Sequence, residues 1–221
     1  MATPTRTQVP PRTAASPLNT LYLTLYNFVS AALWTGVLIR TVQIGVLGGE
    51  PRGVYTGIGE YTKWTQTLAL LEVAHSVLGI VRAPVVTTVM QVASRILLVW
   101  GIADVFPRVA AGSAGYMSML VAWSVTEVVR YSYFVFFLTG RVPGVLSWLR
   151  YNAFFVLYPL GISSEVWLVY QAIPSAMKLS PLFGYGLWAV LAVYVPGSYV
   201  LYSHMMTQRR RIMRGKQRAR E

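Results

Sequence analysis

Six long apolar stretches constrain this chain more than any other feature. They cover about residues 21–47, 61–81, 84–103, 114–138, 148–173 and 181–205. Each stretch is long enough to cross a hydrocarbon core of about 30 Å as a helix. The stretches are continuously apolar, whereas the strands of a membrane barrel alternate apolar and polar residues over about ten residues. We therefore expect an all-α integral membrane protein with a bundle of six transmembrane helices.

Two polar tails flank the predicted membrane domain of residues 21–205. Residues 1–20 are polar and contain several prolines, which is typical of a disordered tail, and no apolar segment near the start resembles a secretory signal peptide. Residues 206–221 form a basic tail that accounts for much of the net charge of +12. This tail fits a topology anchor that attracts anionic lipid headgroups, and the alternatives are an ER-retention signal or a nucleic-acid-binding segment.

An even number of crossings places both tails on the same side of the membrane. The tails, Arg82 and the region 139–150 carry 12 Lys and Arg residues on that side, against five on the other side. Cytosolic segments are enriched in Lys and Arg, so this bias predicts that both termini are cytosolic.

Several polar side chains lie inside the predicted spans, where each charge costs about 2.5–3.5 kcal/mol. They are Glu72, His75, Gln91, Arg95, Glu127, Arg130 and Glu165. Their spacing places Glu72 with His75, Gln91 with Arg95, and Glu127 with Arg130 on shared helix faces. We expect Arg95 to pair with Glu72 or with another intramembrane acid. Three carboxylates against two guanidinium groups leave one carboxylate in excess, although a buried network that only fixes the helix packing remains an alternative.

Tyr158 and Glu165 are separated by two helical turns, so they return to nearly the same helix face. Pro159 and Gly161 lie between them, and a proline can kink a helix. A phenol and an intramembrane carboxylate are suited to acid–base chemistry, and the alternative is a hydrogen-bonded pair at a structural kink. The chain has no cysteine, which excludes disulfides and thiolate chemistry. Its two histidines leave little for a histidine-based metal site.

Four collinear motifs resemble the very-long-chain 3-hydroxyacyl-CoA dehydratases, a family also called protein-tyrosine-phosphatase-like. The similarity covers roughly residues 20–205. The motifs are Leu71-Glu72-Val73-x-His75 with Gly79-x-Val81-Arg82, Gln91-Val92-x-Ser94-Arg95, Glu127-Val-Val-Arg130-Tyr131, and Tyr151-x-x-Phe154-x-x-Leu157-Tyr158-Pro159-x-Gly161-x-x-x-Glu165.

The resemblance implies an endoplasmic reticulum membrane enzyme that removes water from a (3R)-3-hydroxyacyl-CoA in the third step of fatty-acid elongation. It implies a helix bundle enclosing an acyl-chain pocket, no metal or redox cofactor, and other elongase enzymes as partners. Tyr158 and Glu165 would carry the reaction. Glu165 is favoured as the base because a carboxylate in an apolar site is more basic, and the reverse division remains open. Pocket-supporting residues would be Glu72, His75, Arg82, Gln91, Arg95, Glu127, Arg130, Tyr131 and Tyr151.

The anionic CoA end is expected at the cytosolic mouth, near Arg82, Arg141 or Arg150, although positive-inside topology alone also explains these arginines. Two other functions remain open. One is a catalytically silent scaffold for elongation enzymes. The other is a transporter or receptor that uses the intramembrane charges.

Overall fold

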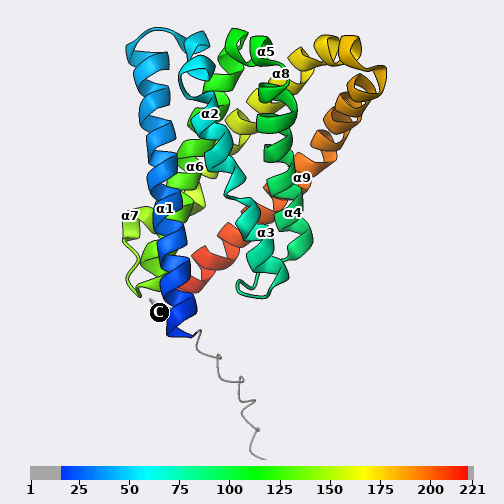
Figure 1. Cartoon of the computed structure of the whole chain (residues 1–221). Helices are drawn as coiled ribbons and strands as arrows, with labels where there is room; N and C mark the ends of the chain where they lie inside the picture. Colours follow the sequence, from blue (N-terminus) through cyan, green and yellow to red (C-terminus); the bar gives the residue numbers. More distant parts are fainter. Residues whose placement is uncertain (1–15, 219–221) are drawn as a thin grey trace, which may run out of the picture.

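The computed structural model of the protein describes residues 16–218, which form helices joined by short connections (Figure 1). These residues contain no strand, so the predicted all-α class is confirmed. In chain order the elements are α1 (Pro17–Val42), η1 (Gln43–Leu47), η2 (Pro51–Gly53), α2 (Val54–Thr67), α3 (Leu70–Val77), α4 (Val85–Ile96), η3 (Leu97–Asp104), α5 (Pro107–Gly112), α6 (Ala114–Leu138), α7 (Gly144–Asn152), α8 (Phe154–Leu179) and α9 (Pro181–Arg218).

The long helices run along one axis in alternating directions (Figure 1). We call one end of the molecule the tail end. It contains the start of α1, the turn 78–84, the turn 139–143 and the end of α9. The opposite end, the loop end, contains η1, η2, α5 and the connection between α8 and α9. Both ends of the described chain therefore lie at the same end of the molecule.

Proline and glycine set the limits of several helices. Proline is the first residue of α1, α5 and α9, where its missing N–H has no helical partner to lose. The Ser16 hydroxyl caps α1 by accepting a hydrogen bond from the Asn19 N–H at 3.2 Å. Gly79 and Gly140 have φ angles of 68° and 86° just after α3 and α6, and this left-handed conformation ends each helix.

Three of the predicted spans differ in detail from the helices. The stretch 61–81 is divided between α2 and α3, which are separated at Leu68 and Ala69. The stretch 84–103 consists of α4 followed by the π-helical η3. The stretch 148–173 includes the break at Ala153, where α7 and α8 meet at a bend of 45°. Hydropathy alone does not reveal such breaks, because the residues at them are apolar too.

The helix ends also differ from the predicted tails. α1 begins at Pro17, and α9 continues to Arg218, so part of the basic segment is helical. Gln, Arg and Met are good helix formers, which explains the extension. The predicted disorder of the first 15 residues and the last three residues of the basic tail lie outside the described residues.

Helix α6 occupies the centre of the core and packs against α1 and α8, and α9 packs on α8. Buried side chains at the centre include Trp34, Met119, Trp123 and Leu168. Large apolar side chains are exposed on the outer faces instead, for example Leu21, Leu25 and Phe28 on α1. This inverted surface is typical of a protein in contact with lipid.

Among the described residues, three helical segments are long and apolar enough to cross a membrane. They are Pro17–Leu47, Val85–Asp104 and Pro181–Arg210, and the bent α7–α8 pair makes four if it is counted as one span. The sequence predicted six. The difference arises because α2 and α3 are short, and α6 carries Glu127 and Arg130.

Candidate active site

A network of ion pairs joins α3, α4 and α6 near the middle of the molecule. Arg95 on α4 forms an ion pair with Glu127 on α6. Arg130 Nε donates to Glu127 Oε2 at 2.6 Å, and its two terminal nitrogens donate to the Glu72 carboxylate at 2.7 and 2.9 Å. The predicted pairing of Glu127 with Arg130 is confirmed, and so is an intramembrane acid as the partner of Arg95. Glu72 pairs with Arg130 rather than with Arg95.

Aromatic side chains connect this network to α1. The Tyr131 hydroxyl donates to Glu72 Oε1 at 2.5 Å, and the Tyr26 hydroxyl lies 3.4 Å from the same oxygen. His75 is buried, and its Nε2 lies 2.8 Å from the hydroxyl of Tyr22. The network therefore fixes the relative positions of α1, α3, α4 and α6.

Glu165 lies in a separate buried environment on α8, with 8% of its surface exposed. Its Oε1 accepts a hydrogen bond from Trp123 Nε1 at 2.7 Å, and its Oε2 accepts one from the Tyr194 hydroxyl at 2.9 Å. Glu165 takes part in none of the ion pairs among the side chains that the structure describes, those of residues 16–203 and 205–210. The Arg95 guanidinium lies over the Trp123 ring, 5.1 Å from its centre, but bonds to Glu127. Glu165 is thus the carboxylate in excess.

Tyr158 also faces α9. Its hydroxyl donates to the backbone carbonyl of Ser198 at 2.9 Å. Ser198 follows Tyr194 by four residues, which places the α9 partners of Tyr158 and Glu165 one helical turn, about 6 Å, apart. The two side chains contact adjacent turns of one helix and are not hydrogen-bonded to each other in the structure. The 45° bend lies at Ala153, before Tyr158, whereas the sequence indicated a kink near Pro159.

The sequence reasoning missed Trp123, Tyr194 and Ser198. Trp123 and Tyr194 look like ordinary core aromatics, because both stand within apolar runs and only their polar atoms reach the site. The one available signal was that a buried tryptophan N–H usually needs an acceptor. Ser198 contributes its backbone carbonyl, which no side-chain pattern reveals.

Three predicted site residues lie outside these contacts. Gln91 is exposed on α4, one turn from Arg95. Arg82 is exposed in the turn at the tail end. Tyr151 on α7 packs edge-to-face against Tyr133, with the ring centres 6.3 Å apart.

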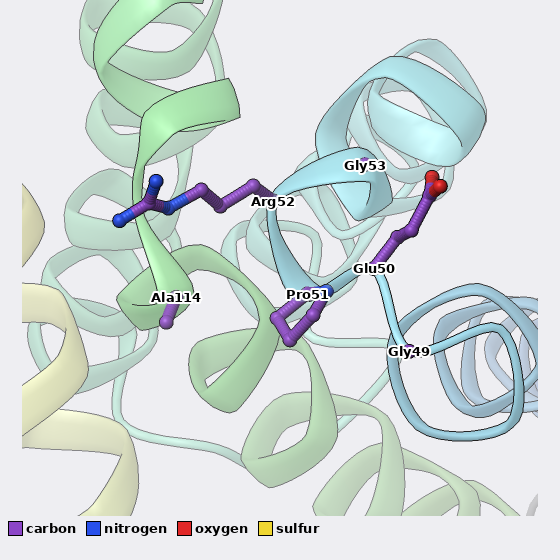
Figure 2. A pocket seen from close by; sticks show the side chains of 6 residues that line it. All are labelled: Gly49, Glu50, Pro51, Arg52, Gly53 and Ala114. Atoms are coloured by element: carbon purple, nitrogen blue, oxygen red, sulfur yellow. The ribbon is translucent and has the colours of Figure 1, made fainter.

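Two hollows in the described part of the chain lie at the loop end, away from Tyr158 and Glu165. Figure 2 shows one of them, lined by Gly49, Glu50, Pro51, Arg52, Gly53 and Ala114. The Arg52 side chain extends across it toward Ala114, while Glu50 points to the opposite side (Figure 2). The second is bordered by residues of α2 and α5. Neither contains a predicted site residue, and the acyl-chain pocket stays a prediction. Among the described side chains of residues 16–203 and 205–210, no three His, Asp or Glu residues are arranged to hold a metal ion.

The fold and site define a helical membrane protein with a buried carboxylate that is hydrogen-bonded to Trp123 and Tyr194 and has no ion-pair partner among the described side chains. The chain belongs to the family described as "Protein tyrosine phosphatase-like protein, PTPLA", whose sequence profile matches residues 66–215.

Three relatives show the extent of the similarity. The "Probable very-long-chain (3R)-3-hydroxyacyl-CoA dehydratase" of Schizosaccharomyces pombe is 44% identical over 86% of this chain and 92% of the relative. PASTICCINO 2 of Arabidopsis thaliana, also named as such a dehydratase, is 39% identical over 90% of this chain and 95% of its own length. The very-long-chain (3R)-3-hydroxyacyl-CoA dehydratase 2 of Homo sapiens is 35% identical over 89% of this chain and 82% of its own length. No solved structure matches this chain.

Proposed function

We propose that this protein dehydrates very-long-chain (3R)-3-hydroxyacyl-CoA to trans-2-enoyl-CoA, the third step of the fatty-acid elongation cycle. The relatives bear the name of this activity and match almost the whole chain. The observation that carries the proposal is the state of Glu165. It is buried and has no cationic partner among the described residues, and its α9 partner Tyr194 lies one turn from Ser198, the α9 partner of Tyr158.

Glu165 acts as the base and Tyr158 as the proton donor. A Glu165 oxygen removes the proton from C2, the electrons of that bond form the C2=C3 double bond, and the C3–O bond breaks. The leaving hydroxyl takes the proton of the Tyr158 O–H and departs as water. Return of the proton from Glu165 to the Tyr158 oxygen resets the site.

The hydrogen-bond partners of the two residues support this division of roles. Trp123 and Tyr194 each use one lone pair of a Glu165 oxygen, and a carboxylate oxygen keeps a further lone pair to accept the C2 proton. Both donors are neutral, so they orient the carboxylate without the charge compensation that Glu72 and Glu127 receive. Tyr158 donates to a single backbone carbonyl, and a substrate hydroxyl can replace that acceptor.

No metal or redox cofactor enters this proposal. Elimination of water removes one proton from C2, adds one to the leaving oxygen and changes no net oxidation state, so positioned acid and base groups are sufficient.

We place the protein in the endoplasmic reticulum membrane, with six crossings and both termini in the cytosol. Three features support this topology. The helices alternate in direction (Figure 1), the outer apolar side chains are exposed, and the described turns of the tail end contain arginines and no acidic residue. The two additional crossings would be formed by α2 with α3 and by α6, whose charges are neutralised inside the bundle. Other elongase enzymes are the expected protein partners, because they make the substrate and consume the product.

The test is the direct measurement of enoyl-CoA formation by the protein purified in detergent. We expect Tyr158→Phe and Glu165→Gln each to reduce turnover by about 10²–10⁴-fold in folded protein. The double variant should lose less than the product of the single losses, because both residues act on one elimination. Tyr185→Phe and Glu50→Gln are matched controls, since both residues are exposed at the loop end.

Other outcomes identify the rival functions. A folded wild-type protein without turnover would leave the scaffold role, and movement of substrate across a vesicle membrane would indicate a transporter. Normal turnover by Glu165→Gln would remove Glu165 from the role of base.

A further inference from the structure

Two arginines at the tail end are held against aromatic rings beside the break between α7 and α8. The Arg150 guanidinium lies 4.3 Å from the ring centre of Tyr133 and 4.6 Å from that of Phe134. Arg209 on α9 lies 5.1 Å from the ring centre of Phe155, and its Nε donates to Asn152 Oδ1 at 3.1 Å. Aromatic contacts of this kind order a guanidinium while leaving N–H groups at its edge.

Neither arginine has an acidic partner within residues 16–218. Arg95, Arg130 and Lys63, in contrast, all pair with carboxylates. The segments 78–84, 139–153 and 205–210 contain no Asp or Glu. Their five basic residues are Arg82, Arg141, Arg150, Arg209 and Arg210. The tail end therefore has a surplus of positive charge that an anion would neutralise.

The two arginines lie close to the candidate active site along a path of aromatic rings. Tyr202 on α9 packs against Phe154, with ring centres 5.9 Å apart, and against Tyr158 at 5.8 Å. Arg150 precedes Tyr158 by eight residues, which corresponds to about 12 Å along a straight helix and less across the 45° bend. The pantetheine arm of coenzyme A is long enough to bridge this gap between a thioester at Tyr158 and phosphates at Arg150.

We propose that Arg150 and Arg209 bind the phosphate groups of the coenzyme A end of the substrate. This inference rests on the proposed dehydratase function and assigns the polar end of the same site. A stacked guanidinium offers a planar pair of donors that suits phosphate oxygens. Arg150 and Arg209 are ordered by ring contacts and lie near the aromatic path to Tyr158. Two other arginines of the tail end, Arg141 and Arg210, are exposed.

Lipid headgroups also carry phosphate, and the experiment separates the two sources. The full-length protein is assayed in detergent with 3-hydroxyacyl-CoA and with the matching 3-hydroxyacyl-pantetheine, which lacks the nucleotide and its phosphates. Arg150→Gln and Arg209→Gln should each raise KM for the CoA ester about tenfold, with kcat nearly unchanged. KM for the pantetheine ester should be the same as in the wild type. Arg210→Gln removes the same charge one residue away and is the control.

Binding of free coenzyme A is measured in parallel, because it tests the role of the two arginines even if the protein shows no turnover. The wild type should bind coenzyme A about tenfold more tightly than Arg150→Gln, and Arg209→Gln provides the second comparison if Arg150→Gln fails to fold. An unchanged KM for the CoA ester, or an equal rise for both esters, would overturn the inference. The inference would also be overturned if phosphatidylserine raised the thermal stability of the wild type but not of the variants, and the variants had no other defect. That result would show that the arginines bind lipid headgroups. Absence of turnover with normal, arginine-dependent binding of coenzyme A would contradict the dehydratase proposal and leave this inference intact.

Discussion

The three buried acids differ in how their charge is balanced. Glu72 and Glu127 share the guanidinium groups of Arg95 and Arg130, so removal of one cation leaves an uncompensated carboxylate. Glu165 is instead satisfied by the neutral donors Trp123 and Tyr194. This difference separates a group of residues that stabilises the bundle from a group that is available for proton transfer.

Arg95→Ala should therefore reduce stability more than it changes the chemistry per folded molecule. Glu127 is 2% exposed and would lose one of its two partners. We expect a loss of about 2 kcal/mol, less than the roughly 3–5 kcal/mol typical of a broken buried pair, because Arg130 still bonds to Glu127. Thermal unfolding in detergent measures this loss, and Arg52→Ala, an exposed arginine at the loop end, is the control.

The combined variant Arg95→Ala with Glu127→Gln provides an internal check. It removes both charges of the pair, so it should recover part of the lost stability. A fully stable Arg95→Ala protein without activity would contradict this assignment and indicate that Arg95 contacts the substrate directly.

At the scale of helices, the sequence predicted the approximate positions of the apolar segments, because hydropathy reports long stretches directly. It predicted six crossings, whereas three or four helical segments of the described chain are long and apolar enough to cross a membrane. It did not predict the breaks at Leu68–Ala69 and Ala153, where apolar residues continue through the interruption. The sequence also predicted that Glu127 pairs with Arg130 and that Arg95 pairs with an intramembrane acid, because a buried charge without a partner is costly. Which carboxylate remained unpaired depended on the distances between helices, and the resemblance of the Tyr158–Glu165 motif, rather than charge arithmetic, pointed to Glu165.

The contact between α6 and α8 sets the geometry around Glu165. A Cβ atom at Gly161 would lie 3.6 Å from Ala122 Cβ and 3.9 Å from Glu165 Oε1, so only a small side chain fits between the helices. Ala122 precedes Trp123, whose N–H bonds to Glu165. The close approach of the two helices thus brings the indole within reach of the carboxylate.

Gly161→Leu should push α6 and α8 apart at this point. We expect a loss of about 1–3 kcal/mol in stability from overpacking, together with a fall in turnover of about tenfold as the Trp123–Glu165 bond is lost. Gly161→Ala should remain folded, because its methyl group makes only ordinary contacts. Gly186→Leu is the matched control, since Gly186 is an exposed helical glycine on α9 with no atom near its Cβ position. Normal stability and activity in Gly161→Leu would show that this contact does not position Glu165.

Over the whole molecule, the acidic residues are distributed unevenly along the axis of the helices. The described turns at the tail end contain arginines and no acidic residue, and the ion-pair network and Glu165 lie within the bundle. Toward the loop end the basic residues, among them Arg52 and Arg108, are accompanied by Glu50, Glu60 and Asp104 (Figure 1). The proposed substrate has an anionic head and an apolar chain, and the absence of acidic residues from the described turns at the tail end suits its head, with the reacting carbons at the proposed site of Tyr158 and Glu165.

The proposed function requires the tail end to lie in the cytosol. Epitope tags at both termini should be accessible to antibody after permeabilisation of the plasma membrane alone. A tag inserted after Gly49, in the exposed turn between η1 and η2, should be detected only when the endoplasmic reticulum membrane is also opened. Catalytic activity of each tagged protein confirms that the tag has not changed the fold. Protection of either terminal tag, or exposure of the tag after Gly49, would reverse the orientation and place the arginines on the side away from cytosolic acyl-CoA.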